Sequence, residues 1–282
     1  MANIQGSNGA DFIEGTEQND FIASGSGDDS ILGFSGDDII TGGDGNDFLN
    51  GNSDNDVLIG ENGDDTLDGS FENDTLQGGP GNDDLDGSLG DDFLMGESGD
   101  DTLDGSLDND SLLGGDGNDS LSGAQGNDTL RGEAGDDTLE GSFDNDLLDG
   151  GDGDDLLQGS FGLDTLSGGF GADVADGQGD ADIYFYSGIG ESTSTSRDTI
   201  AFSSGIDKID LSSIDAIANS AEDDAFEFVG TAPFVNNGAG QVRYDPEANL
   251  IQAIQGFGDF AATLEIESSV DFDELSASDF IL

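Results

Sequence analysis

The sequence predicts an all-β fold: a right-handed parallel β-roll, which is a β-solenoid of about ten 18-residue coils, followed by a β-rich C-terminal cap. Three observations predict it. An aspartate recurs every nine residues from Asp11 to Asp182 without an insertion. A glycine stands five residues before each of these aspartates, except at Ser24, and an apolar residue stands two residues after it. After residue 185 the glycine-rich pattern gives way to ordinary apolar alternation.

Each nine-residue unit is predicted to form a tight turn followed by a short strand. Glycine permits backbone conformations with positive φ, and the Asp or Asn that usually precedes the repeating aspartate favours turns. The three residues after the turn alternate in direction, so the apolar one points inward. A single unit cannot bury that residue, whereas stacked coils bury a continuous ladder of Ile and Leu.

Two units form one coil, because the fourth residue of the unit follows two different patterns. In odd-numbered units it is always Gly, from Gly9 to Gly171, and in even-numbered units it varies. The turns therefore divide into an odd edge and an even edge. On the even edge, Asp108 and Asp144 replace the fourth glycine, and they either distort the turn or add a ligand.

The even edge also carries large apolar residues at the third position of several turns. They are Phe71, Leu89, Leu107, Phe143 and Phe161. We expect them to pack as a ladder over the turns, and an exposed stripe for a partner is the alternative.

The predicted domains are an N-terminal strand (residues 1–5), a roll of twenty units (residues 6–185) and a C-terminal region (residues 186–282). The last region contains several short apolar alternations, which predict strands. Solenoids need an element that covers the last coil, and this region is placed to do so.

Composition excludes several classes of function. The chain has 65 Asp and Glu against 4 Lys and Arg, with a formal net charge of −61, so a nucleic acid would be repelled. No apolar run reaches the roughly 18 residues of a membrane span. Without His or Cys, the usual zinc and haem sites and Ser–His–Asp or Cys–His catalysis are excluded. No pair of acids differs from its copies, and we expect no enzymatic activity.

The repeating aspartates indicate a cation. Stacking would place them about 5 Å apart, where two charges repel by about 3 kcal/mol at an effective dielectric constant near 20. Arg131 is the only base between residues 6 and 185. Oxygen ligands favour a hard cation. Calcium accepts irregular shells of oxygens that include backbone carbonyls, whereas magnesium requires a stricter octahedron. The sequence therefore predicts calcium.

The repeat resembles the RTX (repeats-in-toxin, haemolysin-type) nonapeptide G-G-x-G-x-D-x-U-x, as in residues 42–50 and 114–122. The resemblance implies calcium between successive turns, held by turn carbonyls and by aspartates of both turns, with up to about nine ions per edge. On the odd edge it implies the carboxylates of Asp11, Asp29, Asp47, Asp65, Asp83, Asp101, Asp119, Asp137, Asp155 and Asp173 and the backbone carbonyls of Gly45, Gly63, Gly81, Gly99, Gly117, Gly135 and Gly153. On the even edge, where we expect weaker or fewer sites, it implies Asp20, Asp38, Asp56, Asp74, Asp92, Asp110, Asp128, Asp146, Asp164 and Asp182.

The C-terminal region resembles that of serralysin-type secreted metalloproteases. The matching stretches are residues 205–216, 225–234, 240–252 and 276–282. The protease domain of that family is absent, and without His its zinc motif cannot exist. The resemblance implies export by a one-step ABC-type exporter of Gram-negative cells, through an uncleaved C-terminal signal that ends in residues 279–282. The N-terminus has no basic and apolar segments of a Sec-type signal.

These observations predict a secreted protein whose folding is driven by calcium after export. We expect a structural or adhesive component of the cell surface or extracellular space, with self-association as one possible interaction. The alternative is a non-catalytic targeting or ligand-binding module for a polysaccharide or, with less support, for ice.

Overall fold

The computed structural model describes residues 1–188, 190–193, 196–201, 206–214, 227–228, 241–245, 250–254, 263–268 and 275–282. The chain divides into two compact units, Met1–Leu147 (unit 1) and Leu148–Leu282 (unit 2). The described residues contain strands and one short 3₁₀ turn, η1 (Ala277–Asp279). Of the stretches that resemble the serralysin-type C-terminus, residues 205, 215–216, 225–226, 229–234, 240 and 246–249 lie outside the described residues.

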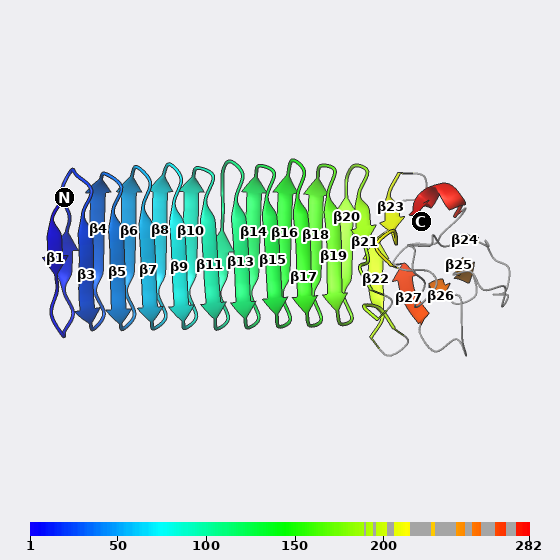
Figure 1. Cartoon of the computed structure of the whole chain (residues 1–282), viewed down its shortest axis with the longest axis horizontal. Helices are drawn as coiled ribbons and strands as arrows, with labels where there is room; N and C mark the ends of the chain where they lie inside the picture. The colour runs from blue at the N-terminus through cyan, green and yellow to red at the C-terminus, as the bar shows by residue number, and fades with distance from the viewer. Residues whose placement is uncertain are drawn as a thin grey trace, which may run out of the picture. The chain divides into compact units, whose positions relative to one another are not determined.

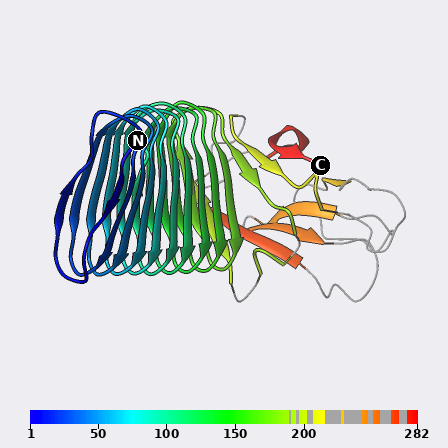
Figure 2. The same ribbon diagram turned by 60° about the vertical axis from the view of Figure 1, so that its left-hand side comes forward.

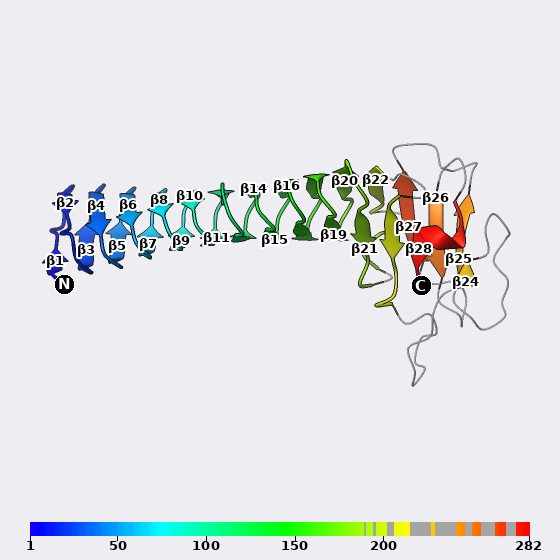
Figure 3. The same ribbon diagram turned by 90° about the horizontal axis from the view of Figure 1, so that it is seen from above.

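Unit 1 consists of parallel strands that alternate between two sheets (Figure 1). One sheet contains β1 (Asn3–Gln5), β3 (Phe21–Ser26), β5 (Ile39–Asp44), β7 (Val57–Asn62), β9 (Thr75–Pro80), β11 (Phe93–Ser98), β13 (Ser111–Asp116) and β15 (Thr129–Ala134). The other contains β2 (Phe12–Glu14), β4 (Ser30–Ser35), β6 (Phe48–Ser53), β8 (Thr66–Phe71), β10 (Asp84–Leu89), β12 (Thr102–Asp104), β14 (Ser120–Gln125) and β16 (Thr138–Phe143). Figure 3 shows the two sheets of this unit as facing layers.

The register of the strands confirms the predicted coil. Leu85 pairs with Leu67 on one side and with Leu103 on the other, so each strand neighbours the strand two units away in sequence. Backbone-to-carboxylate hydrogen bonds join residues 18 positions apart in both units, as from Asp65 to Asp83 and from Asp155 to Asp173. The turns of unit 1 consequently stack in two rows, one at each edge (Figure 2). The predicted all-β parallel β-solenoid is therefore confirmed.

The core of unit 1 lies between the two sheets. The apolar residue two positions after each repeating aspartate is 0–1% exposed from Ile22 to Leu139, and Ile13 in the first coil is 8% exposed. These side chains form the predicted ladder, in which each coil covers the Ile or Leu of its neighbour. The ladder fixes the register, because a slip of one residue would turn every apolar side chain outward.

Unit 2 continues the same pattern and then changes it. One of its sheets contains β17 (Leu147–Asp152), β19 (Thr165–Phe170), β21 (Ile183–Phe185), β23 (Lys208–Asp210) and β28 (Phe280–Ile281). The other contains β18 (Leu156–Phe161), β20 (Val174–Gln178), β22 (Asp198–Ala201), β27 (Thr263–Ser268), β26 (Leu250–Ile254), β25 (Gln241–Asp245) and β24 (Glu227–Phe228). Strand β26 runs antiparallel to both β25 and β27. In the described part of the C-terminal region, strands therefore predominate, as predicted.

Candidate metal centre

The repeating aspartates form a buried column along each edge of the coils. In unit 1 the aspartates from Asp20 to Asp146 are 1–3% exposed. Asp20 Oδ1 accepts a hydrogen bond from the Ala2 N–H, and from Asp29 onward each Oδ1 accepts one from the backbone N–H of the aspartate one coil earlier. The Asp65 N–H donates to Asp83 Oδ1 at 2.7 Å, and the Asp83 N–H donates to Asp101 Oδ1 at 2.7 Å. Stacking thus brings the carboxylates of neighbouring coils together, as the spacing predicted.

The second carboxylate oxygen is the feature that fits a cation. In many of the repeating aspartates the Oδ2 atom is buried and accepts no hydrogen bond. These are Asp29, Asp38, Asp47, Asp56, Asp65, Asp74, Asp83, Asp92, Asp101, Asp110, Asp119, Asp128, Asp173 and Asp182. The first two turns differ, since Asp11 Oδ2 accepts from the Ser7 N–H at 2.6 Å and Asp20 Oδ2 from the Thr16 N–H at 2.8 Å. A buried ionised oxygen without a partner costs several kcal/mol. A cation beside each column would remove that cost.

Glycines make room for both kinds of candidate ligand. A Cβ on Gly78, the first residue of its turn, would collide with Asp83 Oδ2, so the carboxylate folds back over the start of the turn. A Cβ on Gly99, the fourth residue of its turn, would collide with the carbonyl oxygen of Gly81 in the preceding coil, and Gly99 has a φ of +134°. The same relation joins Gly63 to Gly45. Fourth-position carbonyls therefore form a column beside the carboxylates on the odd edge.

The even edge keeps a positive φ where the fourth glycine is replaced. Asp108 and Asp144 have φ values of +77° and +75°, of the same sign as the glycines they replace. A Cβ on Gly126 would collide with the Asp108 carbonyl oxygen, as on the odd edge. The sign of φ is thus kept, because aspartate tolerates the left-handed region. Strand β12 nevertheless ends at Asp104, before the Asp108 turn, whereas its neighbours β10 and β14 extend to Leu89 and Gln125. A distorted turn and an added ligand both stay open as predictions for Asp108. The side chain of Asp108 is exposed.

Burial and the neighbouring charges change the acidity of the columns. Burial raises the pKa of Asp83 to about 7, and the charges of Asp101 and Asp65 act in the same direction, while the hydrogen bond from the Asp65 N–H opposes them. Burial likewise raises the pKa of Asp74 and of Asp110 to about 8. Burial of these three carboxylates without a cation therefore favours their protonated form near neutral pH. Among the described residues, no three or more His, Cys, Asp or Glu side chains, those of the columns included, are grouped so that they could hold a metal ion by themselves.

The apolar residues of the even edge stack but stay partly exposed. Backbone pairing places Leu89 beside Phe71 and beside Leu107, yet Phe71 and Phe143 are each 52% exposed. A shallow hollow of about 660 Å³ lies over Phe71, Leu89 and Leu107. The stacking agrees with the predicted ladder, and the exposure leaves an apolar stripe at the surface.

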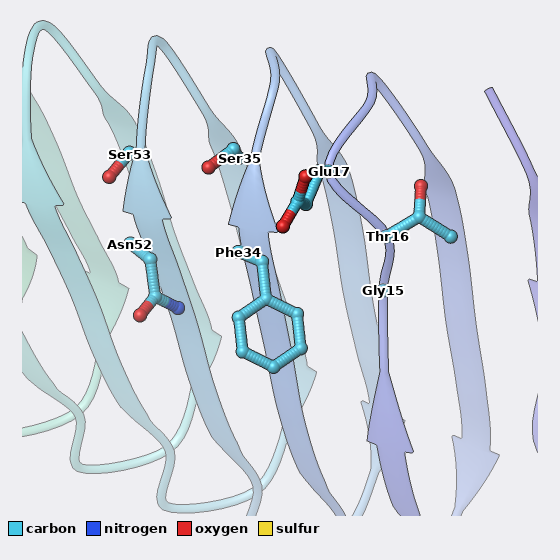
Figure 4. Close-up of a pocket in the computed structure, with 7 residues that line it drawn as sticks. All are labelled: Gly15, Thr16, Glu17, Phe34, Ser35, Asn52 and Ser53. Atoms are coloured by element: carbon cyan, nitrogen blue, oxygen red, sulfur yellow. The ribbon is translucent and has the colours of Figure 1, made fainter.

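A second hollow, of about 400 Å³, lies on the same edge in the first coils. It is lined by Gly15, Thr16, Glu17, Phe34, Ser35, Asn52 and Ser53 (Figure 4). The side chains of Phe34 and Asn52 project from neighbouring turns, and Phe34 is 38% exposed. The even edge thus presents aromatic and polar groups together.

Two aspartates that the sequence reasoning missed extend the columns in unit 2. The Asp173 N–H donates to Asp198 Oδ1 and the Asp182 N–H to Asp207 Oδ1, each at 3.2 Å. Both steps span 25 residues instead of 18, so a search for the strict period passes over them. A signal was nevertheless present, because Asp198 and Asp207 are nine residues apart and each precedes an isoleucine by two positions.

The comparison with protein-family models agrees with this geometry. A family model described as the RTX calcium-binding nonapeptide repeat (4 copies) matches residues 3–31, 32–67, 59–94, 86–121, 95–130, 122–157 and 158–188. Among solved structures, the chain is similar to the solution structure of a subunit of the mannuronan C5-epimerase of Azotobacter vinelandii. The sequence identity is 24%, the TM-score is 0.37, and the match covers 53% of this chain and 79% of that chain. No curated protein matches the chain. None of the helices in the described part of the chain has the length and apolar character of a membrane span.

Proposed function

Because the chain belongs to the RTX calcium-binding nonapeptide-repeat family, we propose that it is a secreted calcium-binding protein whose β-roll folds on calcium binding. The observation that carries this proposal is the column of buried Oδ2 atoms that accept no hydrogen bond. Calcium, when bound, would neutralise the stacked carboxylates and bridge neighbouring turns.

Two kinds of group in the chain would bind the ions, and two other features would keep the binding position open. The repeating aspartates of both edges would supply carboxylate oxygens, and the odd-edge glycines from Gly45 to Gly153 would supply backbone carbonyls. The Oδ1 hydrogen bond from the preceding coil holds each carboxylate in place, as at Asp83, so that Oδ2 is the atom left for a cation. The first glycine of each turn keeps that position free of a side chain, as at Gly78.

The free energy of calcium binding is large enough to convert the chain from unfolded to folded. At about 1 mM calcium and a Kd of about 10⁻⁴ M, each site contributes about 1.4 kcal/mol. Nine sites on one edge would contribute about 12 kcal/mol, which is comparable with the whole stability of an ordinary domain, about 5–15 kcal/mol. In calcium-poor cytosol the chain, with a net charge of −61, would stay unfolded.

The C-terminal residues support export before folding. Asp279 is 1% exposed and closes a capping box with Ser276, and Phe280 is 7% exposed in β28, which pairs with β23. An exporter cannot read these residues while they are packed, so recognition of them has to precede folding. Deletion of residues 276–282 should retain the protein inside a Gram-negative host that carries an ABC-type exporter, whereas Ser278→Ala, an exposed substitution, should be exported normally. Export of the deletion variant would contradict this part of the proposal.

For the role outside the cell we propose a structural or adhesive component. A specific observation favours a second candidate, a non-catalytic module that binds a polysaccharide: the even edge exposes Phe71 and Phe143, and aromatic faces are suited to sugar rings. Light scattering with and without calcium would detect assembly, and a glycan array would detect sugar binding. A protein that stays monomeric and binds one glycan class would favour the second candidate.

A calcium titration followed by circular dichroism and calorimetry tests the central proposal. We expect little β structure in EGTA at neutral pH and a cooperative gain of β structure as calcium is added. Full β structure and cooperative melting in EGTA, unchanged by calcium, would contradict it.

A further inference from the structure

The outward sides of the two sheets of unit 1 differ in composition. In β3, β5, β7, β9, β11, β13 and β15 the second residue of the strand is buried, so the first and third residues point outward. We call these outward positions together the apolar face. Its large apolar residues are exposed or partly exposed, and they include Phe21, Ile39, Val57, Ile59, Phe93 and Leu113.

This face is almost free of charge in a chain whose formal net charge is −61. Within the described strands that form it, the outward residues include the base Arg131 and no acid. At the same positions of the other sheet, from β2 to β16, there is no base, and the acids are Glu14, Asp68, Asp84, Asp86, Asp104 and Glu140. Exposed acids also lie in both rows of turns, as at Asp37 and Asp100. The two sheets are facing layers, so the acidic side and the apolar face lie on opposite sides of unit 1 (Figure 3).

The apolar face is large enough for a weak protein–protein interface. Neighbouring strands lie about 4.8 Å apart and six residues extend about 20 Å, so the face covers at most about 700 Å². Two copies packed through it would bury up to about 1,400 Å² in total, at the lower end of the range of specific interfaces, about 1,200–2,000 Å². An interface of this size predicts a reversible dimer with a Kd of about 10⁻⁵ M.

A second copy of the chain fits this face better than other partners do. A basic protein would be attracted to the acidic side and to the turns instead. Sugar rings pack on aromatic faces. Phe21 and Phe93, however, are four strands apart in the sheet, about 19 Å, and the strands between them present Ile, Val, Thr and Gln. A second copy supplies the same aliphatic surface, and a two-fold axis lets the face pack on itself while the acidic sides of both copies point away.

We propose that two copies of the folded chain form a two-fold dimer through the apolar face of unit 1. This inference deepens the proposed structural role, and it rests on the proposed function only in that the roll has to fold in calcium. Analytical ultracentrifugation of the full chain in calcium and about 0.15 M salt tests it. The wild type should pass from monomer to dimer as its concentration rises to about 200 µM.

Thr75→Lys and Thr66→Lys are the matched variants, because each replaces an exposed threonine that begins a strand, β9 or β8. Thr75 lies between Val57 and Phe93 on the apolar face, whereas Thr66 lies between Phe48 and Asp84 on the acidic side. Thr75→Lys should raise the Kd of the dimer by about tenfold or more, because it would bury an unpaired charge. Its positive charge reduces the repulsion between the two chains, so weaker association could not come from their net charge. Thr66→Lys should leave the Kd unchanged.

Circular dichroism of the same samples separates the possible failures. If calcium induces no β structure in the wild type, the proposed function fails and the dimer with it. A wild type that gains β structure and stays monomeric overturns the dimer alone, and a glycan array with the wild type and Thr75→Lys would then show whether a sugar occupies the face. A dimer that both variants weaken equally, or that Thr75→Lys leaves unchanged, also overturns the inference. Should either variant lose its β structure, Gln77→Lys and Asn50→Lys, at the third residues of β9 and β6, replace the pair with the same expected results.

Discussion

Replacing Asp83 with Asn would separate a calcium ligand from an ordinary hydrogen-bond acceptor. Asp83 is 2% exposed, and its Oδ1 accepts from the Asp65 N–H while its own N–H donates to Asp101. Asparagine has nearly the same size and can keep the Oδ1 acceptor. It replaces Oδ2, which accepts no hydrogen bond, with an NH₂ group that cannot bind a cation. The substitution therefore removes one charge and one ligand oxygen and preserves the packing.

In calcium the substitution should destabilise the roll by about 3 kcal/mol. Asp83 stands between two neighbouring turns of the odd edge, so the sites on both sides lose a ligand. At about 1 mM calcium each site contributes about 1.4 kcal/mol, and two sites give this value. Urea unfolding in saturating calcium measures it as a lower midpoint with an unchanged slope.

Without calcium the effect should change sign. Burial raises the pKa of Asp83 to about 7, so at pH 8 the folded metal-free roll contains a charge that burial opposes, and asparagine removes it. The measurement is folding in EGTA at about pH 8 by the stabilising osmolyte trimethylamine N-oxide, where the variant should fold at a lower osmolyte concentration. Destabilisation of equal size in EGTA and in calcium would refute the reasoning, because Oδ2 would then stabilise the roll without an ion.

Three further predictions concern protons and turns. In EGTA, acidification should fold the roll, and circular dichroism would follow the change. The pKa values of Asp74 and Asp110 are raised from 3.8 to about 8 in the folded roll. Their protonation therefore stabilises the metal-free fold fully below about pH 4, and this contribution is lost as the pH rises through about 8. Gly99→Ala should lower the stability by about 2–5 kcal/mol in a thermal melt in calcium, because the new Cβ would collide with the preceding coil at a residue of positive φ. The control, Gly9→Ala, has no atom within 4 Å of the new Cβ and should change the stability by less than about 0.5 kcal/mol. Equal effects of the two substitutions would contradict the stacking of the turns. Asp108→Gly should stabilise the roll by about 1 kcal/mol, because glycine adopts a φ of +77° without the strain that aspartate has there. The number of bound calcium ions should stay the same, and a lower number would identify the Asp108 carboxylate as a ligand.

The repetitive part of the fold was predictable because each unit repeats the same local chemistry. The nine-residue spacing fixed the turns, the alternation at the fourth position fixed the 18-residue coil, and the residues from Ile22 to Leu139 form the inner ladder as predicted. For the candidate site, the sequence predicted which carboxylates stack on one another. The different roles of the two oxygens of a carboxylate were not predictable. Only the stacking of the coils shows that, at Asp83, the backbone of the preceding coil donates to Oδ1 and Oδ2 accepts no hydrogen bond.

The C-terminal arrangement could not be obtained from the period. Asp198 pairs with Asp173 across 25 residues, so a register set by nine fails there, although the local motif of an aspartate two positions before an isoleucine persists. Strand β28 pairs with β23 across a large sequence separation, and β26 reverses direction between β25 and β27. Such long-range pairings depend on which apolar faces meet, and short alternations alone do not specify the partner.

Backbone strain gives a physical reason for the prediction that the even edge binds calcium more weakly than the odd edge. The even-edge turn that contains Ser70 and Glu72 places two non-glycine residues at positive φ, 78° and 68°, whereas the odd-edge turn at Glu61 places one there and then uses Gly63. Each such residue costs about 1–2 kcal/mol. One ion at about 1.4 kcal/mol therefore offsets the strain of an odd-edge turn but not that of a doubly strained even-edge turn. We therefore expect such a turn to depend for its stability on pairing with the neighbouring coils, as between Leu89 and Phe71, and to bind calcium more weakly than an odd-edge turn.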